Sequence, residues 1–279
     1  MYRFMLLLLL ACLCLGCEET EVKQVPPQLV VEGWIDSGGF PIVKLTTTVP
    51  VSKQAQSTDS LDRFLVRWAK VTVSDGTREV VLTGMPNRDY FPPYIYTTSE
   101  MRGEVGKTYT LKVDYQDFHA YAVTTIPKPV ALSRISAEEI PLYPGWFKLR
   151  IDFKDNPTTT DYYKVFIRLY GEKQDFHSTN FGTYSDRLLP TQASLIVENA
   201  RQNVVNPTAT FFKHYEIVNI KFCHIDSVSY AFWKSFDDYQ SEGRNPLFNS
   251  MQNIRSNIQG GLGYWCGYGA SYYAYQILN

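Results

Sequence analysis

The sequence predicts a mainly β protein built from two immunoglobulin-like β-sandwich domains in tandem, with one helix in the second domain. Tyr and Phe are abundant, with 20 and 16 copies, and such residues suit pleated, half-buried strands. Short segments that alternate apolar and polar residues recur along the chain, with turn residues between them. A proline-rich linker at residues 126–129 separates the domains, which we expect at residues 28–127 and 128–279.

The first 16 residues are predicted to be a signal peptide. Arg3 precedes an apolar run that ends at Leu15 and is too short to span a bilayer as a mature helix. Gly16 and Cys17 close this run as a lipobox does, so we expect cleavage before Cys17 and acyl chains on its thiol. Cys12 is the competing acceptor, but the sequence turns polar only after Cys17. The other alternative is an ordinary signal peptide with a soluble, secreted product.

Residues 17–27 are predicted to form a lipidated tether. Its acidic run at residues 18–21 is either a solvated spacer or an export signal, and the residues alone leave both open. The tether ends at Pro26 and Pro27, where strand patterns begin.

In the first domain, strand patterns at residues 29–35 and 42–46 flank a glycine-containing turn. Asp75 and Gly76 lie between two apolar runs, which is a strong hairpin signal. Residues 109–115 alternate cleanly and are predicted to pair with residues 119–125 across a short turn at Gln116 and Asp117.

In the second domain, strands are predicted at residues 146–153, 161–170 and 215–225. The helix is predicted near residues 228–242, with Asp226 or Ser227 as its cap and Gly243 as its stop. Its aromatic stripe falls at helical spacing, and packing on a sheet is a better explanation than a cofactor site: Tyr230, Trp233, Phe236 and Tyr239.

Cys223 and Cys266 are the cysteines that remain after Cys17. We expect a disulfide between them, because an exported protein lies where disulfides persist. The alternative is two separate buried thiols that act as small apolar residues.

Two aromatic clusters are candidates for a contact surface, since rings stack on sugars and anchor protein partners. One spans residues 90–96. The other lies beside the C-terminal glycines and is the preferred contact surface: Tyr264, Trp265, Tyr268, Tyr272 and Tyr273. Packing in the core or at a sheet edge is the alternative for both clusters.

No catalytic motif is found, and we expect no enzyme activity, no cofactor and no metal. The chain has no zinc-binding HExxH helix, no nucleophile elbow and no phosphate-binding loop. His214, His224 and the two cysteines match no standard metal spacing. Acidic residues between Asp152 and Asp161 lack a calcium-loop pattern, so a solvated turn is preferred there. A formal charge of −1 argues against nucleic-acid binding.

The order of several motifs resembles a Bacteroidota lipoprotein family, the domain of unknown function 4249. They are residues 30–35 (VVEGWI), 71–76 (VTVSDG), 161–163 (DYY) and the closing 256–268 (SNIQGGLGYWCGY), where Cys266 departs from the family pattern. The acidic run after Cys17 also resembles the signal that sends such lipoproteins to the outer face of the outer membrane. The resemblance implies no chemistry and no catalytic residues.

The resemblance and the anchor together suggest a non-enzymatic binding or accessory component of a TonB-dependent outer-membrane nutrient-uptake system. Its expected partners are the membrane, through the lipid anchor, a transporter barrel, and an unknown small ligand or glycan. It would be surface-exposed on the outer membrane. The alternative is a free-standing surface protein that binds glycans or acts as an adhesin.

Overall fold

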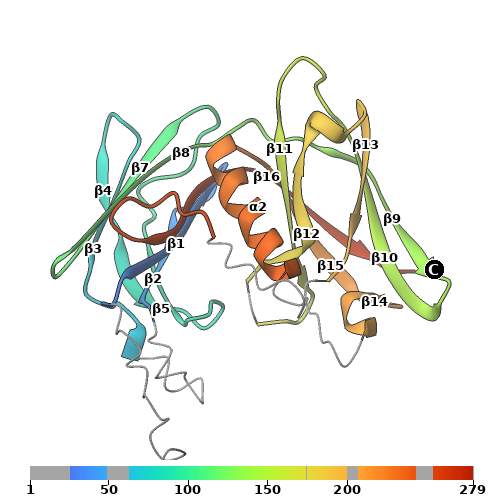
Figure 1. The fold of residues 1–279 in the computed structure, drawn as a ribbon, viewed down its shortest axis with the longest axis horizontal. Coiled ribbons are helices and arrows are strands. Elements are labelled where there is room, and N and C mark those ends of the chain that lie inside the picture. The colour runs from blue at the N-terminus through green and yellow to red at the C-terminus, as the bar shows by residue number, and fades with distance from the viewer. Residues whose placement is uncertain (1–25, 49–62, 174, 200–206, 243–253, 279) are drawn as a thin grey trace, which may run out of the picture.

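The computed structural model describes residues 26–48, 63–173, 175–199, 207–242 and 254–278 (Figure 1). The predicted signal peptide, Cys17 and the acidic run lie outside these residues.

The elements of the first half are β1 (Leu29–Asp36), β2 (Ile42–Thr47), β3 (Lys70–Ser74), β4 (Glu79–Val81), β5 (Thr83–Pro86), β6 (Tyr94–Thr97), β7 (Thr108–Tyr115) and β8 (Phe118–Thr125).

The elements of the second half begin with a long hairpin and end with the longest strand of the described chain. They are β9 (Leu132–Ile140), β10 (Tyr143–Lys154), β11 (Tyr162–Leu169), β12 (His177–Ser185), η3 (Asp186–Leu188), β13 (Gln192–Val197), η4 (Pro207–Thr210), β14 (Phe212–Lys213), β15 (Ile217–Ile225), α2 (Ser227–Glu242) and β16 (Leu262–Gln276). The described chain is therefore mainly β, as predicted, and α2 is its one α-helix. No described helix has the length and apolar character needed to cross a membrane.

One eight-stranded sheet runs through both halves of the molecule. Its order is β12-β11-β15-β16-β1-β2-β6-β5. Two four-stranded sheets complete the halves: β4-β3-β7-β8 in the first half, and β13-β10-β14 with β9 beside β10 in the second. Figure 1 shows the two halves side by side, with α2 between them.

The shared sheet depends on β16, which serves both halves. The N-terminal part of β16 pairs in parallel with β1, from Leu262 opposite Val30 to Tyr268 opposite Asp36. The C-terminal part pairs antiparallel with β15, from Gly269 to Gln276. Residues 127 and 128, where the sequence predicts the domain boundary, lie between β8 and β9, but β16 pairs with β1 of the first half. The two sandwiches are thus joined by a common strand as well as by a linker.

Each half has its own apolar core, because side chains alternate between the two faces of every strand. The first core includes Val31, Tyr109 and, from β16, Trp265. The second includes Phe153, Tyr163 and Phe222, whose rings stack or meet edge to face. A third, smaller cluster lies under α2 and contains Cys223, Trp233, Cys266 and Tyr268. The predicted hairpins are also present, β3–β4 around Asp75 and β7–β8 around Gln116.

The helix begins where the sequence predicts, because Asp226 caps it. Its Oδ1 accepts the backbone N–H of Ser229 at 2.7 Å, which satisfies one of the unpaired donors of the first turn. Its Oδ2 accepts from the Thr124 hydroxyl at 3.0 Å and the Thr125 N–H at 3.2 Å. The cap therefore fastens α2, which belongs to the second half, to β8 of the first half. The predicted stop at Gly243 lies outside the described residues.

Glycines allow β16 and its neighbours to approach closely. Gly263 has a φ of +107°, and a Cβ built there would lie 1.9 Å from the carbonyl oxygen of Val31. Gly260 has a φ of +78° and is equally crowded by the His119 carbonyl oxygen at 2.0 Å. The closing glycines thus permit a left-handed backbone and tight strand contact.

Candidate functional site

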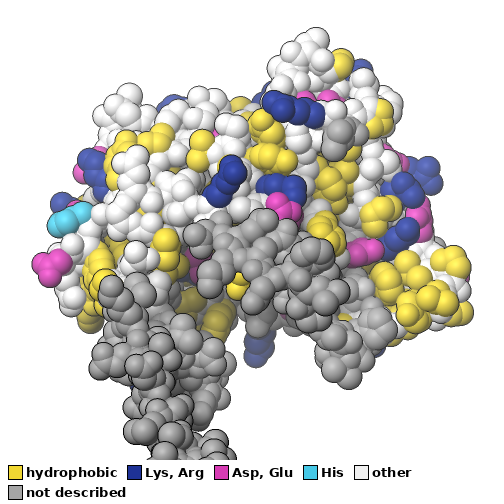
Figure 2. All heavy atoms as spheres, in the orientation of Figure 1, with side chains coloured by type: hydrophobic (Ala, Val, Ile, Leu, Met, Phe, Trp, Pro, Cys, Tyr) yellow, Lys and Arg dark blue, Asp and Glu magenta, His cyan; other side chains and the backbone are white. Residues whose placement is uncertain are grey.

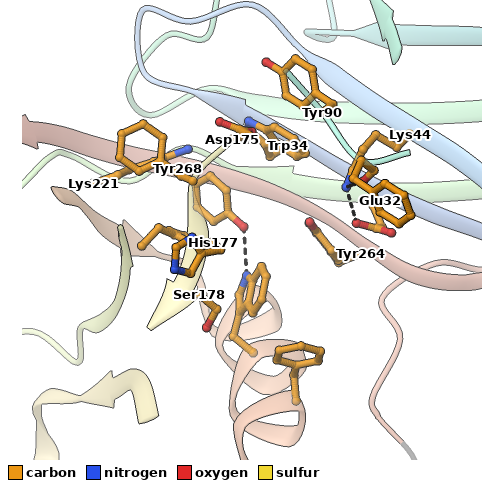
Figure 3. Close-up of a pocket in the computed structure, with 15 residues that line it drawn as sticks. Glu32, Trp34, Lys44, Tyr90, Asp175, His177, Ser178, Lys221, Tyr264 and Tyr268 are labelled. Atoms are coloured by element: carbon orange, nitrogen blue, oxygen red, sulfur yellow. Dashed lines mark hydrogen bonds and ion pairs between the residues drawn. The ribbon is translucent and has the colours of Figure 1, made fainter. Parts of the chain in front are cut away.

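A cavity of about 260 Å³ opens where the two halves meet, between α2 and the shared sheet (Figure 3). Strands β1 and β2 and the segment at Tyr90 line it from the first half, whereas β11, β12, β15 and α2 line it from the second. Most of the lining side chains are aromatic: Trp34, Tyr90, Phe91, Phe166, Phe176, Trp233, Phe236, Tyr264 and Tyr268. We call this cavity the cleft.

The period of the strands explains how β16 contributes to the cleft. Tyr264 and Tyr268 are four positions apart and so face the same side of the sheet. Trp34 lies opposite Cys266 in the neighbouring strand β1. From the other side, β15 brings Lys221 opposite Tyr272. Three adjacent strands thus direct aromatic and charged side chains toward the space below α2.

Lys221 and Asp36 form a buried ion pair that crosses from one half to the other. The Lys221 Nζ lies 2.7 and 2.8 Å from the two carboxylate oxygens of Asp36, and the Tyr272 hydroxyl donates to the same carboxylate at 2.5 Å. Burial alone would lower the pKa of Lys221, but the Asp36 carboxylate outweighs it, so the pKa is raised. Burial and the Asp36 carboxylate raise the pKa of Tyr272.

The Lys221 ammonium also lies close to several ring faces. Its Nζ is 4.6 Å from the Tyr268 ring centre and 6.0 Å from that of Trp34. Such cation–π contacts strengthen when the cation is removed from water. The arrangement fixes Lys221 as a structural cation at the inner end of the cleft.

A second buried ion pair holds α2 against the sheet. Lys164 on β11 is fully buried, and its Nζ lies 3.1 Å from Asp237 on α2 and 2.9 Å from the Thr183 hydroxyl. Burial lowers the pKa of Lys164 to about 8, against the opposing effect of the Asp237 carboxylate. The same Nζ is 4.7 Å from the Trp233 ring centre. Trp233 in turn donates its indole N–H to the Tyr268 hydroxyl at 2.9 Å, so this wall of the cleft is rigidly supported.

Lys44, Glu32 and Asp175 also line the cleft. Lys44 pairs with Glu32 at 2.7 Å and donates to the carbonyl of Phe91 at 3.0 Å. Burial raises the pKa of Asp175, while Lys221 and Lys44 oppose this effect at longer range. Within the described part of the chain, no lysine, arginine or histidine nitrogen forms an ion pair with Asp175. Among these residues, Asp175 is therefore a half-buried carboxylate without a directly paired cation.

A larger groove of about 910 Å³ adjoins the cleft and shares four of its walls, Glu32, Trp233, Phe236 and Tyr264. Its other walls are mostly apolar side chains of β1, α2 and the segment before β16, such as Val30, Phe232 and Leu262. The two spaces thus lie side by side along α2, and charged side chains are more numerous in the wall of the cleft than in that of the groove.

The structure divides the five residues of the predicted contact surface between the two faces of β16. Tyr264 and Tyr268 line the cleft, and Tyr272, which is half exposed, bonds to Asp36 beside it. Trp265 and Tyr273 occupy the opposite face of β16. Trp265 is fully buried in the first core, where its indole N–H donates to the Tyr109 carbonyl at 3.0 Å. Tyr273 packs against the second core, and its hydroxyl accepts the backbone N–H of Leu132 at 2.7 Å. Alternation along the strand separates the five residues into two faces.

Sequence reasoning missed the charged residues of the site. Asp36 follows Trp34 by two positions in the opening strand, so both face one side. Lys221 is a lone lysine in the mostly apolar run of β15, which was a signal for a buried ion pair. Asp175 lies in a connection before β12 and carried no pattern.

The expected disulfide is absent, since Cys223 and Cys266 are both free and buried. Cys223 lies opposite Ala270 on β16, and Cys266 precedes Ala270 by four positions. That offset corresponds to about 13 Å along the strand, well beyond the roughly 7 Å between Cα atoms that a disulfide tolerates. Burial raises the pKa of both thiols, to about 12 for Cys266.

The acidic residues considered for calcium are only partly gathered. Asp155 and Asp161 lie close to Asp186, whereas Asp152 instead accepts from the Ser194 hydroxyl at 2.6 Å. Asp155 accepts from the Tyr163 hydroxyl at 2.5 Å, and Asp161 lies 3.2 Å from the His224 Nε2.

The face of the molecule in Figure 2 carries charges of both signs. Lysines and arginines are interspersed there with acidic side chains, in keeping with a formal net charge of −1. The described residues of this face form no broad basic area of the kind that nucleic acids require.

A comparison with protein families finds that a domain of unknown function (DUF4249) matches residues 18–273, which is nearly the whole chain. No curated protein matches the sequence.

Proposed function

This chain belongs to the DUF4249 family, a domain of unknown function, and we propose that it is a non-enzymatic binding lipoprotein that captures a small ligand in the cleft. The observation that supports this proposal most strongly is the composition of the cleft. A recessed space lined by aromatic rings, with a few oriented charged groups, is the usual form of a small-molecule site. The walls are fixed by two buried ion pairs, so the site is formed before any ligand arrives.

The state of the buried lysines favours binding over catalysis. Lys221, the most buried charged side chain of the cleft, is paired with Asp36 and has a raised pKa, which makes it a poor nucleophile or base at neutral pH. Lys164, whose pKa is lowered, is fully buried behind Trp233 and Phe166 and does not line the cleft. Both lysines thus act by holding the walls together.

We further propose that the protein is anchored by acyl chains on Cys17 at the outer membrane and works beside a TonB-dependent transporter. The lipobox-like end of the apolar run supports the anchor. The acidic residues that follow Cys17 support export to the cell surface. In this arrangement the cleft captures a nutrient outside the cell and the barrel receives it.

A free-standing surface protein that binds glycans or acts as an adhesin is the second candidate. The observation that favours it is Trp68, an indole that is 88% exposed outside the cleft and available to a large partner. Such a protein needs no transporter.

The two candidates separate in one isolation experiment. The lipidated protein is extracted from its own outer membrane in mild detergent, and what co-purifies is identified by mass spectrometry. A β-barrel transporter in near-stoichiometric amount is the expected result. Recovery of the protein alone, in detergent that keeps other barrel complexes intact, would contradict the transporter assignment and favour the free-standing surface protein.

A further inference from the structure

We infer that the cleft ligand is a saccharide, with one sugar ring held against Trp34 and Tyr90 and bonded by Asp175; this inference rests on the proposed binding function. Three features of the cleft support it (Figure 3). They are the polar groups that form no hydrogen bond with another described side chain, the balance of charge around these groups, and the aromatic walls.

Four polar groups of the cleft form no hydrogen bond with another side chain among the described residues. Asp175 accepts the backbone N–H of the adjacent Phe176. In the described part of the chain, the indole N–H of Trp34 and the hydroxyls of Tyr90 and Tyr264 make no hydrogen bond. The carboxylate of Asp175 is an acceptor, the indole is a donor, and each phenol is both. A ligand that matches them must carry donors and acceptors side by side, and a hydroxyl group supplies both.

The charges around the cleft favour an uncharged ligand. Three carboxylates face three cations in and beside the cleft: Glu32, Asp36 and Asp175, and Lys44, Arg168 and Lys221. Lys44 is paired with Glu32, and Lys221 with Asp36. The third cation, the Arg168 guanidinium, lies 5.0 Å from the Phe176 ring centre. A charged ligand would lose its hydration without gaining a net opposite charge. A neutral ligand avoids this cost.

The aromatic walls complete the match to a sugar ring. The Trp34 and Tyr90 ring centres are 6.1 Å apart with their planes tilted by 43°, so they form two sides of an angled apolar wall. A pyranose has apolar C–H faces and a polar rim of hydroxyls, and rings such as these cover the faces while Asp175 reaches the rim. The cavity of about 260 Å³ suits a single ring, and the adjoining groove lets the rest of the molecule extend along α2.

Binding is measured on the full mature lipoprotein in a polyoxyethylene detergent, because detergents with sugar headgroups would compete. Saturation-transfer NMR is run with a panel of neutral mono- and trisaccharides, including glucose, galactose, mannose, xylose and N-acetylglucosamine. The same measurement is run with glycine, leucine, lysine and glutamate, since a zwitterion also carries donors and acceptors. Tryptophan fluorescence follows each titration, because Trp34 and Trp233 line the cleft.

Three variants place the binding in the cleft. Asp175→Asn keeps the shape but removes the charged acceptor and should weaken saccharide binding by about tenfold. Trp34→Phe keeps an aromatic ring but removes the indole N–H and should weaken it by roughly fivefold. Trp68→Phe makes the same change at an exposed site outside the cleft and should leave binding unchanged. Identical urea unfolding curves establish that each variant is folded.

The expected result is that at least one saccharide binds, that amino acids do not, and that the cleft variants weaken binding while Trp68→Phe does not. Binding of amino acids without any saccharide would overturn the saccharide assignment and leave the binding function standing. Saccharide binding that is insensitive to Asp175→Asn and Trp34→Phe would overturn the assignment to this cleft. Failure of every probe class would overturn both the inference and the proposed function.

Discussion

Lys221 is the residue on which the geometry of the cleft depends most. Its ammonium joins β15 of the second half to Asp36 on β1 of the first half, at the junction of the two sandwiches. An ion pair at such a depth is costly to form, but removing one partner is more costly, because the other charge stays buried alone. The pair therefore makes the relative position of the two walls specific.

Replacement of Lys221 by Met should destabilise the protein by about 3–5 kcal/mol, because Asp36 would then be buried without its cation. Addition of Asp36→Asn should restore more than half of the loss, since the amide oxygen still accepts from Tyr272. Lys112→Met breaks an exposed pair with Glu79 and serves as the control, with an expected cost below about 1 kcal/mol. Urea unfolding measures all three free energies. An equal cost for Lys221→Met and Lys112→Met would contradict the structural role.

At the scale of the element, β16 is the strand that the sequence made hardest to interpret. Its glycines, aromatic residues and length arise from three demands: a parallel pairing with β1, an antiparallel pairing with β15, and one face exposed to the cleft. Gly263 lies where β16 starts to pair with β1 and has no room for a side chain. A side chain at Gly263 should therefore displace β16 and disturb the first core, to which Trp265 of the same strand belongs.

Gly263→Ala should cost more than about 4 kcal/mol or prevent folding, because its Cβ would meet the Val31 carbonyl and its φ is positive. Gly145→Ala is the matched control. Gly145 also has a positive φ, of +80°, but no other atom lies within 4 Å of the position that a Cβ would occupy there. Its replacement should cost about 1–2 kcal/mol. Thermal and urea unfolding measure the loss of stability in each variant. Similar losses for Gly263→Ala and Gly145→Ala would argue against the close β1–β16 contact.

The β3–β4 hairpin should contribute a pH-dependent stability through Asp75. Two groups donate hydrogen bonds to the Asp75 carboxylate: the Thr77 hydroxyl at 2.7 Å and the backbone N–H of Arg78 at 3.0 Å. These bonds lower the pKa of Asp75 below its ordinary value of 3.8. A lowered pKa stabilises the folded state above pH 3.8, and this contribution is lost as the pH falls further.

Asp75→Asn should therefore lower the unfolding free energy by about 1–2 kcal/mol at pH 7. The difference from the unmodified protein should shrink progressively below about pH 4, because protonation removes the same charge from Asp75. Urea titrations at about pH 7, 4 and 2.5 measure this trend. A difference that stays constant over this range would mean that the carboxylate charge is not responsible.

At the scale of the whole molecule, the shared strand makes the two sandwiches one cooperative unit. Trp265 on β16 completes the first core, and the C-terminal part of the same strand pairs with β15 in the second half. Asp226 caps α2 and also accepts a hydrogen bond from Thr124 on β8. Unfolding of either half removes a strand or a cap from the other. The expected outcome is a single transition.

Coincident urea transitions for the two halves test this coupling. Hydrogen exchange of β7 reports the first half and exchange of β11 the second, and both should open with the same free energy of unfolding. A chain of residues 26–127 alone, which lacks β16, should fail to give a cooperative transition. A stable, cooperatively folded fragment of this kind would be incompatible with the shared strand.

Much of the architecture was predictable because it depends on local patterns. Alternation identified β7 and β8, Asp75 and Gly76 identified a hairpin, and Asp226 identified the start of α2. The role of β16 was not predictable, because pairing between β1 and a strand more than 200 residues later leaves no local signal. For the same reason the cleft was only partly found. Its tyrosines stood out by composition, whereas Asp36, Asp175 and Lys221 meet only through the tertiary fold.

The most direct test of the central claim, that the cleft holds a small ligand, is a capture experiment with two forms of the mature protein. One is unmodified and the other carries Ser178→Trp, which fills the cleft from β12. Each is incubated with a small-molecule extract of the growth medium and washed, and the compounds released by denaturation are identified by mass spectrometry. We predict compounds that the unmodified protein retains and the equally stable Ser178→Trp variant does not. The same compounds, in the same amounts, from both proteins would contradict a binding site in the cleft.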